Sequence, residues 1–150
     1  MKELIDVLKN RELTLSCAES LTAGMFASTL AGTPGVSAIF KGGVVTYWNE
    51  SKEEIIKVPA DVIRECGVVS AECASWMARG VKKLFDTDVS ISFTGNAGPA
   101  VQEGKPVGLV YIGICLGETT FAFEYQFEGK RNEIRKACVK EGIRKLLELL

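Results

Sequence analysis

The sequence predicts an α/β protein of three layers, with helices on both faces of a mixed, mostly parallel sheet that ends in an antiparallel hairpin. Helical and strand-like segments alternate through the first part of the chain, and two strand-like segments joined by a short turn come late. Alternation is typical of parallel strands joined by helices, whereas a short turn joins antiparallel strands. At 150 residues the chain has the length of one domain, so we expect residues 1–150 to form a single domain.

The chain opens with a helix and a strand. Residues 2–10 place Leu4, Ile5 and Leu8 at helical spacing, which predicts a short amphipathic helix. Residues 13–17 are a strand candidate that ends in the polar turn 18–20.

A second helix and strand are expected next. Residues 21–30 have the pattern of a helix, and the Gly- and Pro-containing segment 32–35 stops it. Residues 40–48 are rich in β-branched and aromatic residues after Gly42-Gly43, which predicts a strand.

Three helices are expected in the middle of the chain. Ser51 and Glu54 fit a capping box, so one helix should begin at about residue 50 or 52. Pro59 suits the first turn of a short helix that runs to about residue 65. Ser70 is expected to cap a longer helix that ends at about residue 85.

The last part of the chain should complete the sheet. Residues 89–93 predict a strand followed by a glycine-marked loop at 94–99. Residues 108–115 and 119–127 predict the antiparallel hairpin. From about Arg131 the chain should close with a helix whose apolar face packs on the sheet.

The charge balance excludes several classes of partner. Lys and Arg number 18 and Asp and Glu 19, for a net charge of −1, and no block of like charges stands out. This is not the electrostatic pattern of a protein that binds nucleic acid or an anionic membrane. Apolar runs are far shorter than the roughly 20 residues of a membrane span, and the N-terminus lacks a signal-peptide core. We therefore expect a cytoplasmic protein without nucleic-acid or membrane partners.

The absence of histidine excludes several classes of catalysis. Ser-His-Asp and Cys-His hydrolases and most zinc hydrolases need that residue, and this chain has none. The five cysteines form no CxxC pair, so we expect buried free thiols and neither a metal site nor a disulfide framework. No cofactor is expected. If the protein is a hydrolase, its general base must be Lys, Tyr, Asp or Glu.

Three polar turns follow predicted strands, at the edge of the sheet where α/β proteins bind ligands. The turn at 19–24 could hold an oxyanion or phosphate on backbone N–H groups, or could be a simple helix cap. In the segment 42–52, Lys52 could act as a base if it is desolvated, or could be a solvated lysine. The loop at 94–99 could present backbone donors, or could be a tight turn that needs glycine.

Taken together, the motifs resemble the C-terminal domain of the CinA family. The string AESLTAG at 18–24 is similar to the family's AESCTGG, and GGVVTYWNESK at 42–52 to its GGVVTYSNEAK. Four further matches follow in the same order. GVVS at 67–70 is similar to the family's GAVS, TGNAGP at 94–99 to its TGIAGP, and KPVG at 105–108 is identical to its KPVG. FEGKR at 127–131, together with Arg135, is similar to its F-x-G-D-R-x-x-x-R. The resemblance covers the chain from about Leu13 to the last helix.

This resemblance implies an amidase that converts nicotinamide mononucleotide to nicotinate mononucleotide and ammonia without a metal. It implies that Ser20 is the nucleophile, Lys52 its general base and Tyr47 a support for proton transfer. The residues expected to bind the substrate's amide and phosphate, or to stabilise the oxyanion, are Thr22, Ala23, Gly24, Thr94, Gly95, Asn96, Ala97, Gly98, Arg131 and Arg135. A nucleophilic serine paired with lysine agrees with the absence of histidine.

Several positions depart from the family pattern. Leu21, Ala23, Asn96 and Lys130 replace Cys, Gly, an apolar residue and Asp, and residues 100–104 replace a Gly-rich DGGTEE-like loop. Two alternatives therefore stay open: a non-catalytic pyridine-nucleotide-binding or regulatory domain, and an amidase with a different substrate. Larger family members carry a further N-terminal domain, for which we expect no room here. We also expect a homo-oligomer, through the helix faces or the edge of the late hairpin.

Overall fold

The computed structural model describes all 150 residues. The helices are α1 (Lys2–Asn10), α2 (Met25–Ala31), α3 (Asn49–Ile56), α4 (Ala60–Cys66), α5 (Ala71–Phe85) and α6 (Arg131–Leu149), with the 3₁₀ turn η1 (Val36–Ala38). The strands are β1 (Leu15–Glu19), β2 (Phe40–Val45), β3 (Val89–Gly95), β4 (Leu109–Leu116) and β5 (Thr119–Gln126). The alternation of helices and strands, followed by the late hairpin, confirms the predicted fold class.

The five strands form one mixed sheet in the order β2-β1-β3-β4-β5. β1 pairs in parallel with both β2 and β3, while β4 pairs antiparallel with β3 and β5. Only β4 therefore runs against the other strands, as a mostly parallel sheet requires. The carboxyl ends of β1, β2 and β3 consequently meet at one edge of the sheet.

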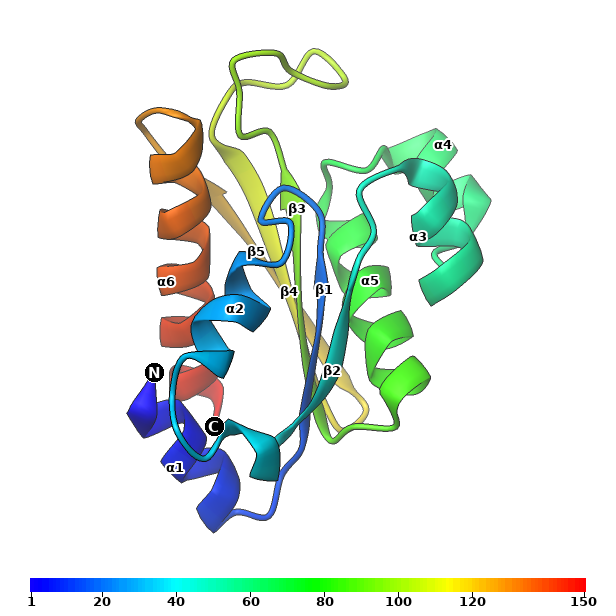
Figure 1. The fold of residues 1–150 in the computed structure, drawn as a ribbon. Coiled ribbons are helices and arrows are strands. Elements are labelled where there is room, and N and C mark those ends of the chain that lie inside the picture. Colours follow the sequence, from blue (N-terminus) through cyan, green and yellow to red (C-terminus); the bar gives the residue numbers. More distant parts are fainter.

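Helices cover both faces of the sheet, which makes the three layers (Figure 1). α1, α2 and α6 lie on one face, over a core of 20 buried apolar residues. α5 lies on the other face, with α3 and α4 packed against it, over a core of eight. The first turn of α6 and the loop after β3 lie at the same end of the molecule as the turn after β1. Three distant segments thus converge at one edge.

Small residues on both sides let the Ala74 and Ala78 part of α5 pack closely on the sheet. The hydroxyls of Ser90 and Ser92 donate hydrogen bonds to the α5 carbonyls of Ala78 and Ala74, each at 2.6 Å. A Cβ on Gly113 of β4 would lie 2.3 Å from the Ala74 carbonyl oxygen. Buried serines here are hydrogen-bonded, which removes the cost of burying a polar group.

The second helix starts later than the periodicity predicts. It begins at residue 25 and not at 21, because Ala23 (φ 47°) and Gly24 (φ 92°) adopt left-handed conformations. The buried carboxylate of Glu19 takes the role of a helix cap. It accepts backbone N–H groups at 2.9–3.0 Å from Gly24, Phe26 and Ala27. A side chain six residues before the first residue of the helix therefore decides where the helix begins.

Of the two predicted side-chain caps, one forms. Ser70 accepts the backbone N–H of Cys73 at 3.1 Å, which confirms the cap of α5. The capping box predicted for α3 is wrong, because Ser51 donates to the carbonyl of Trp48 at 2.7 Å and the helix starts at Asn49. The strand predicted to residue 48 ends at residue 45, where the chain turns into α3.

All five cysteines are free, as predicted, and every one except Cys66 is buried. No helix combines the length and the apolar character needed to cross a membrane.

Gly113→Ala should destabilise the fold by about 1–3 kcal/mol, the usual cost of overpacking, because the new methyl group forces α5 away from the sheet. The matched control is Gly32→Ala, at an exposed position with helical φ where ordinary contacts surround the new Cβ. Urea denaturation measures both variants. Equal stability of Gly113→Ala and Gly32→Ala would contradict the close packing of α5.

Candidate active site

A polar pocket opens where the carboxyl ends of β1 and β3 meet. Its empty volume is about 460 Å³, part of it open to solvent. The lining residues are Ser20, Leu21, Tyr47, Val68, Thr94, Gly95, Asn96, Ala97, Gly98, Ala100, Gln102 and Arg131. The predicted turn, strand end and loop thus contribute to one pocket, at the edge of the sheet where α/β folds bind ligands.

Ser20 directly follows β1, at the carboxyl edge of the sheet. Its backbone N–H donates to the carbonyl of Phe93 on β3 at 3.0 Å, which extends the strand pairing by one residue. Its hydroxyl receives a hydrogen bond from Lys52 at 3.2 Å. The sheet therefore sets the position of Ser20, and its hydroxyl faces both the lysine and the pocket.

Lys52 is almost completely buried, with 1% of its surface exposed. Its Nζ lies 2.7 Å from the carbonyl oxygen of Thr46 and 3.4 Å from that of Tyr47. It makes no ion pair with a carboxylate. A neutral amine could donate its two hydrogens to these carbonyls and direct its lone pair at the Ser20 hydroxyl. The surroundings of Lys52 thus suit a base.

Burial lowers the pKa of Lys52 below its ordinary value, because the charged form loses its hydration. A negative charge on Cys73, were its thiol ionised, and the charge of Glu103 oppose this shift as smaller contributions. Burial also raises the pKa of the Cys73 thiol to about 12, so that this neighbour is uncharged at neutral pH. Desolvation therefore makes Lys52 easier to deprotonate than an exposed lysine.

Tyr47 and Arg131 close one side of the pocket. Arg131 donates from Nη2 to the Tyr47 hydroxyl at 2.8 Å and from Nη1 to the carbonyl of Gly98 at 2.7 Å. The hydroxyl of Tyr47 is thus bound to Arg131 and makes no hydrogen bond with Ser20 or Lys52. Arg131 is the arginine that lines the pocket.

Arg135 has a different position from Arg131. Its guanidinium donates to the carbonyls of Leu21 (2.9 Å) and Thr22 (2.8 Å) and to the side chain of Asn132 (3.0 Å). It does not line the pocket. Arg135 therefore braces the turn that follows Ser20, and its donors face the chain itself.

Of the expected oxyanion donors at residues 22–24, two are already used within the chain, whereas the backbone N–H of Thr22 makes no hydrogen bond. The N–H of Ala23 donates to the Ser20 carbonyl at 3.1 Å, and that of Gly24 to Glu19. The start of α2 is thus already occupied by the protein's own carboxylate. Among the pocket-lining groups, the backbone N–H groups of Leu21, Ala97 and Gly98 make no hydrogen bond within the chain.

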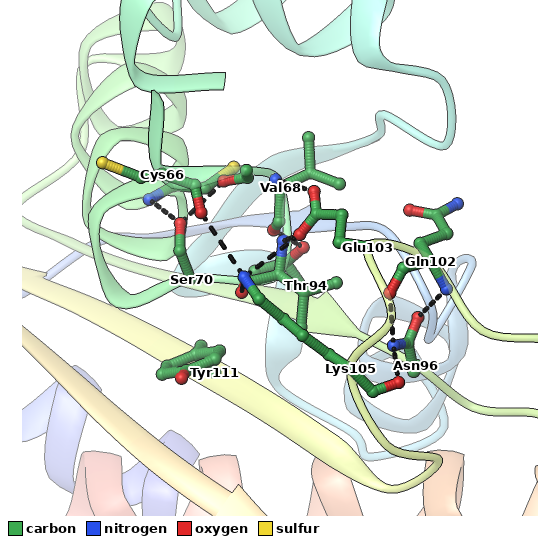
Figure 2. A network of polar contacts seen from close by, with 12 residues as sticks. Cys66, Val68, Ser70, Thr94, Asn96, Gln102, Glu103, Lys105 and Tyr111 are labelled. Atoms are coloured by element: carbon green, nitrogen blue, oxygen red, sulfur yellow. Dashed lines mark hydrogen bonds and ion pairs between the residues drawn. The ribbon is translucent and has the colours of Figure 1, made fainter. Parts of the chain in front are cut away.

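Within the loop after β3, Thr94 and Asn96 hold the wall of the pocket. The Thr94 hydroxyl donates to the carbonyl of Val68 at 2.5 Å. The amide of Asn96 makes three hydrogen bonds to the backbone of Gln102 and Lys105 (Figure 2). The polar group that departs from the family pattern at Asn96 therefore closes the loop on itself.

Sequence reasoning missed several residues of the site. Glu19 orients the turn after Ser20, and its place beside Ser20 in the quoted motif was a signal that could have found it. Val68, Ala100 and Gln102 line the pocket. Val68 lies in a quoted motif, and the signal for Ala100 and Gln102 was their place in the divergent segment 100–104.

The fold and the site together define a class: an α/β domain in which a serine at the carboxyl edge of the sheet is paired with a buried lysine. The chain belongs to the CinA family, since the family model for the CinA C-terminal domain matches residues 1–150.

Relatives and solved structures agree with this assignment. The chain is 48% identical over 145 residues to a protein of Listeria welshimeri named as a competence-damage inducible protein, and 44% identical over 147 residues to one of Bacillus cereus with the same name. These matches take in 96% and 97% of this chain but only 35% and 36% of the relatives. The chain thus spans about a third of the length of these curated relatives.

Two crystal structures match along nearly the whole chain. A competence-damaged protein (CinA) superfamily protein from Escherichia coli is 30% identical with a TM-score of 0.97, over 99% of this chain and 87% of that one. The competence/damage inducible protein CihA from Agrobacterium tumefaciens is 31% identical with a TM-score of 0.94, over 99% and 92%.

Lys52→Met should remove a specific pH dependence of stability. The pKa of Lys52 is lowered in the folded state, so the unfolded chain binds this proton more tightly, and folding is penalised most at low pH. Relative to Lys52→Met, the wild type should gain free energy of unfolding as the pH rises toward 10.5, by about 1.4 kcal/mol for each unit of pKa lowering.

Urea unfolding of both proteins between pH 6 and 10 (roughly the span over which lysine charge burial matters) measures this difference. Lys140→Met, at an exposed position on α6, is the matched control and should give a constant difference. A constant difference for Lys52→Met as well would mean that Lys52 is not desolvated.

Proposed function

We propose that the chain is a serine–lysine amidase that converts nicotinamide mononucleotide to nicotinate mononucleotide and ammonia. The observation that carries the proposal is the 3.2 Å approach of the buried Lys52 Nζ to the Ser20 hydroxyl, at a polar pocket and without a carboxylate partner for the lysine. A serine becomes a nucleophile when a neighbouring base takes its proton, and a desolvated lysine can be that base.

The acylation step uses both members of the pair. Lys52 takes the hydroxyl proton as the oxygen of Ser20 attacks the carboxamide carbon, and the carbonyl π electrons move to its oxygen. Unpaired main-chain N–H groups that line the pocket, among them those of Leu21, Ala97 and Gly98, are donors for that oxyanion. Loss of one such donor typically slows an acyl transfer by about 10²–10³.

The intermediate then collapses and water completes the reaction. The protonated Lys52 gives its proton to the departing nitrogen, the carbon–nitrogen bond breaks, and ammonia leaves an acyl ester on Ser20. Water attacks that ester while Lys52 takes one of its protons, and the proton returns to Ser20 as the carboxylic acid is released. The same group thus acts as base and acid in turn.

Arg131 is the residue best suited to the substrate's phosphate. It is the one cation among the residues that line the pocket, and a guanidinium binds phosphate through two parallel hydrogen bonds. Arg135 is less suitable, because it does not line the pocket and its guanidinium faces the turn after Ser20.

Purified protein should release ammonia from nicotinamide mononucleotide, and Ser20→Ala should lower the rate by at least about 10³-fold because the nucleophile is lost. Lys52→Ala should do the same through loss of the base. Coupled detection of ammonia measures the rates.

Ser28→Ala and Lys140→Ala make the same chemical changes at exposed positions on α2 and α6 and should keep wild-type rates. Calorimetric binding of the mononucleotide without ammonia release would favour a non-catalytic nucleotide-binding domain. Full activity of the Ser20 and Lys52 variants would remove the mechanism.

Arg131→Ala should raise KM for nicotinamide mononucleotide by roughly tenfold or more, since it removes charge-assisted hydrogen bonds to phosphate. The KM for nicotinamide riboside, which lacks the phosphate, should rise much less. Steady-state kinetics with both substrates measure the two changes. Lys136→Ala, an exposed cation on the same helix, is the control. Equal losses for both substrates would show that Arg131 acts only through Tyr47 and Gly98.

A further inference from the structure

The loop between β3 and β4 is fastened to the connection between α4 and α5 by two charged side chains (Figure 2). The carboxylate of Glu103 accepts the backbone N–H groups of Val68 at 2.7 Å and Val69 at 3.0 Å, one on each oxygen. Lys105 donates to the carbonyl of Val69 and lies 3.2 Å from Glu103. Most of the loop is exposed, yet the Glu103 side chain is only 28% exposed.

The connection is shaped to receive this carboxylate. Gly67 has a φ of +81°, and a Cβ there would lie 2.4 Å from an oxygen of Glu103. Two adjacent N–H groups match the two oxygens of a carboxylate. A carboxamide matches them poorly, because its NH₂ group would face an N–H donor.

The fastened connection is itself a wall of the pocket. Val68 lines the pocket, and its peptide groups are held from both sides, by Glu103 at the N–H and by the Thr94 hydroxyl at the carbonyl. Ala100 and Gln102, beside Glu103 in the loop, line the pocket as well. One carboxylate therefore couples two parts of the pocket wall that are more than 30 residues apart in the sequence.

We propose that Glu103 is a positioning residue of the Ser20–Lys52 site, where its carboxylate latches the loop 96–105 onto residues 67–69 and holds the pocket wall against the substrate. This role rests on the proposed amidase function. Glu103 also supplies the negative charge that acts on Lys52 from outside the pair. Around the lysine, Cys73 on α5 is uncharged at neutral pH and Ser20 after β1 is neutral. Glu103 is therefore the charged neighbour, and removing its charge tests its electrostatic effect on Lys52.

The first measurement is independent of activity. Glu103→Gln should speed amide hydrogen exchange in residues 67–69 and 96–105, since Val68 or Val69 loses its acceptor. Gly67→Ala should do the same by displacing the carboxylate sterically. Glu118→Gln, the same change in the exposed turn between β4 and β5, is the matched control and should exchange like the wild type.

The second measurement uses the reaction. Glu103→Gln should lower kcat/KM on the order of ten- to a hundredfold, the usual cost of a misplaced site, with most of the loss in KM. Removal of its negative charge disfavours protonated Lys52, so the acidic limb of the kcat/KM profile should move to lower pH. A change that only loosened the structure would leave that limb in place.

A fluorophosphonate probe separates the latch from the amidase. Ser20 attacks its phosphorus and displaces fluoride, so the rate of labelling reports the serine–lysine pair without the nucleotide. If the wild type releases no ammonia, the proposed function fails, while slower labelling of Glu103→Gln still supports the latch. Unchanged exchange in Glu103→Gln overturns it. The latch is also overturned if Glu103→Gln exchanges faster but is labelled at the wild-type rate and keeps the acidic limb of its kcat/KM profile in place. Failure of the probe to label Ser20 in the wild type overturns it as well.

Discussion

The site depends on one buried amine that is held by backbone carbonyls and faces a serine. β2 ends at residue 45 and α3 begins at residue 49, so Lys52 in the first turns of the helix can reach back to the carbonyls of Thr46 and Tyr47. These carbonyl acceptors orient the amine in place of a carboxylate. A carboxylate would stabilise the charged form of the lysine. The same short connection therefore buries Lys52, orients it and lowers its pKa.

The surrounding structure holds Ser20 against that amine. Pairing with Phe93 places the serine on the sheet, Glu19 closes the turn onto α2, and Arg135 braces the turn from α6. Each of these groups satisfies buried polar atoms at the same time, so little of the turn can move alone. The N–H groups of Ala97 and Gly98, which line the pocket, are left without partners in the chain. Functional sites are where such unsatisfied groups are expected.

Regular elements were well predicted where periodicity or a strong cap governs them. α1, α5 with its Ser70 cap and the hairpin of β4 and β5 lie within a residue or two of expectation. The errors came where a side chain competed with the local pattern. Glu19 delayed the start of α2, and Ser51 bonded to Trp48 in place of a capping box. Such contacts depend on three-dimensional positions that periodicity does not describe.

By itself, the sequence determined the order of the elements and excluded histidine-based catalysis, because these follow from residue types and spacing, and its resemblance to the CinA family made Ser20 and Lys52 the candidates. Only the tertiary structure decided which arginine lines the pocket, that the donors of Ala23 and Gly24 are already used, and that the divergent loop is latched by Glu103. The physical reason is that hydrogen bonds and burial join residues tens of positions apart. A spacing along the chain shows what a side chain could do, whereas its surroundings decide whether its donors and its proton are free.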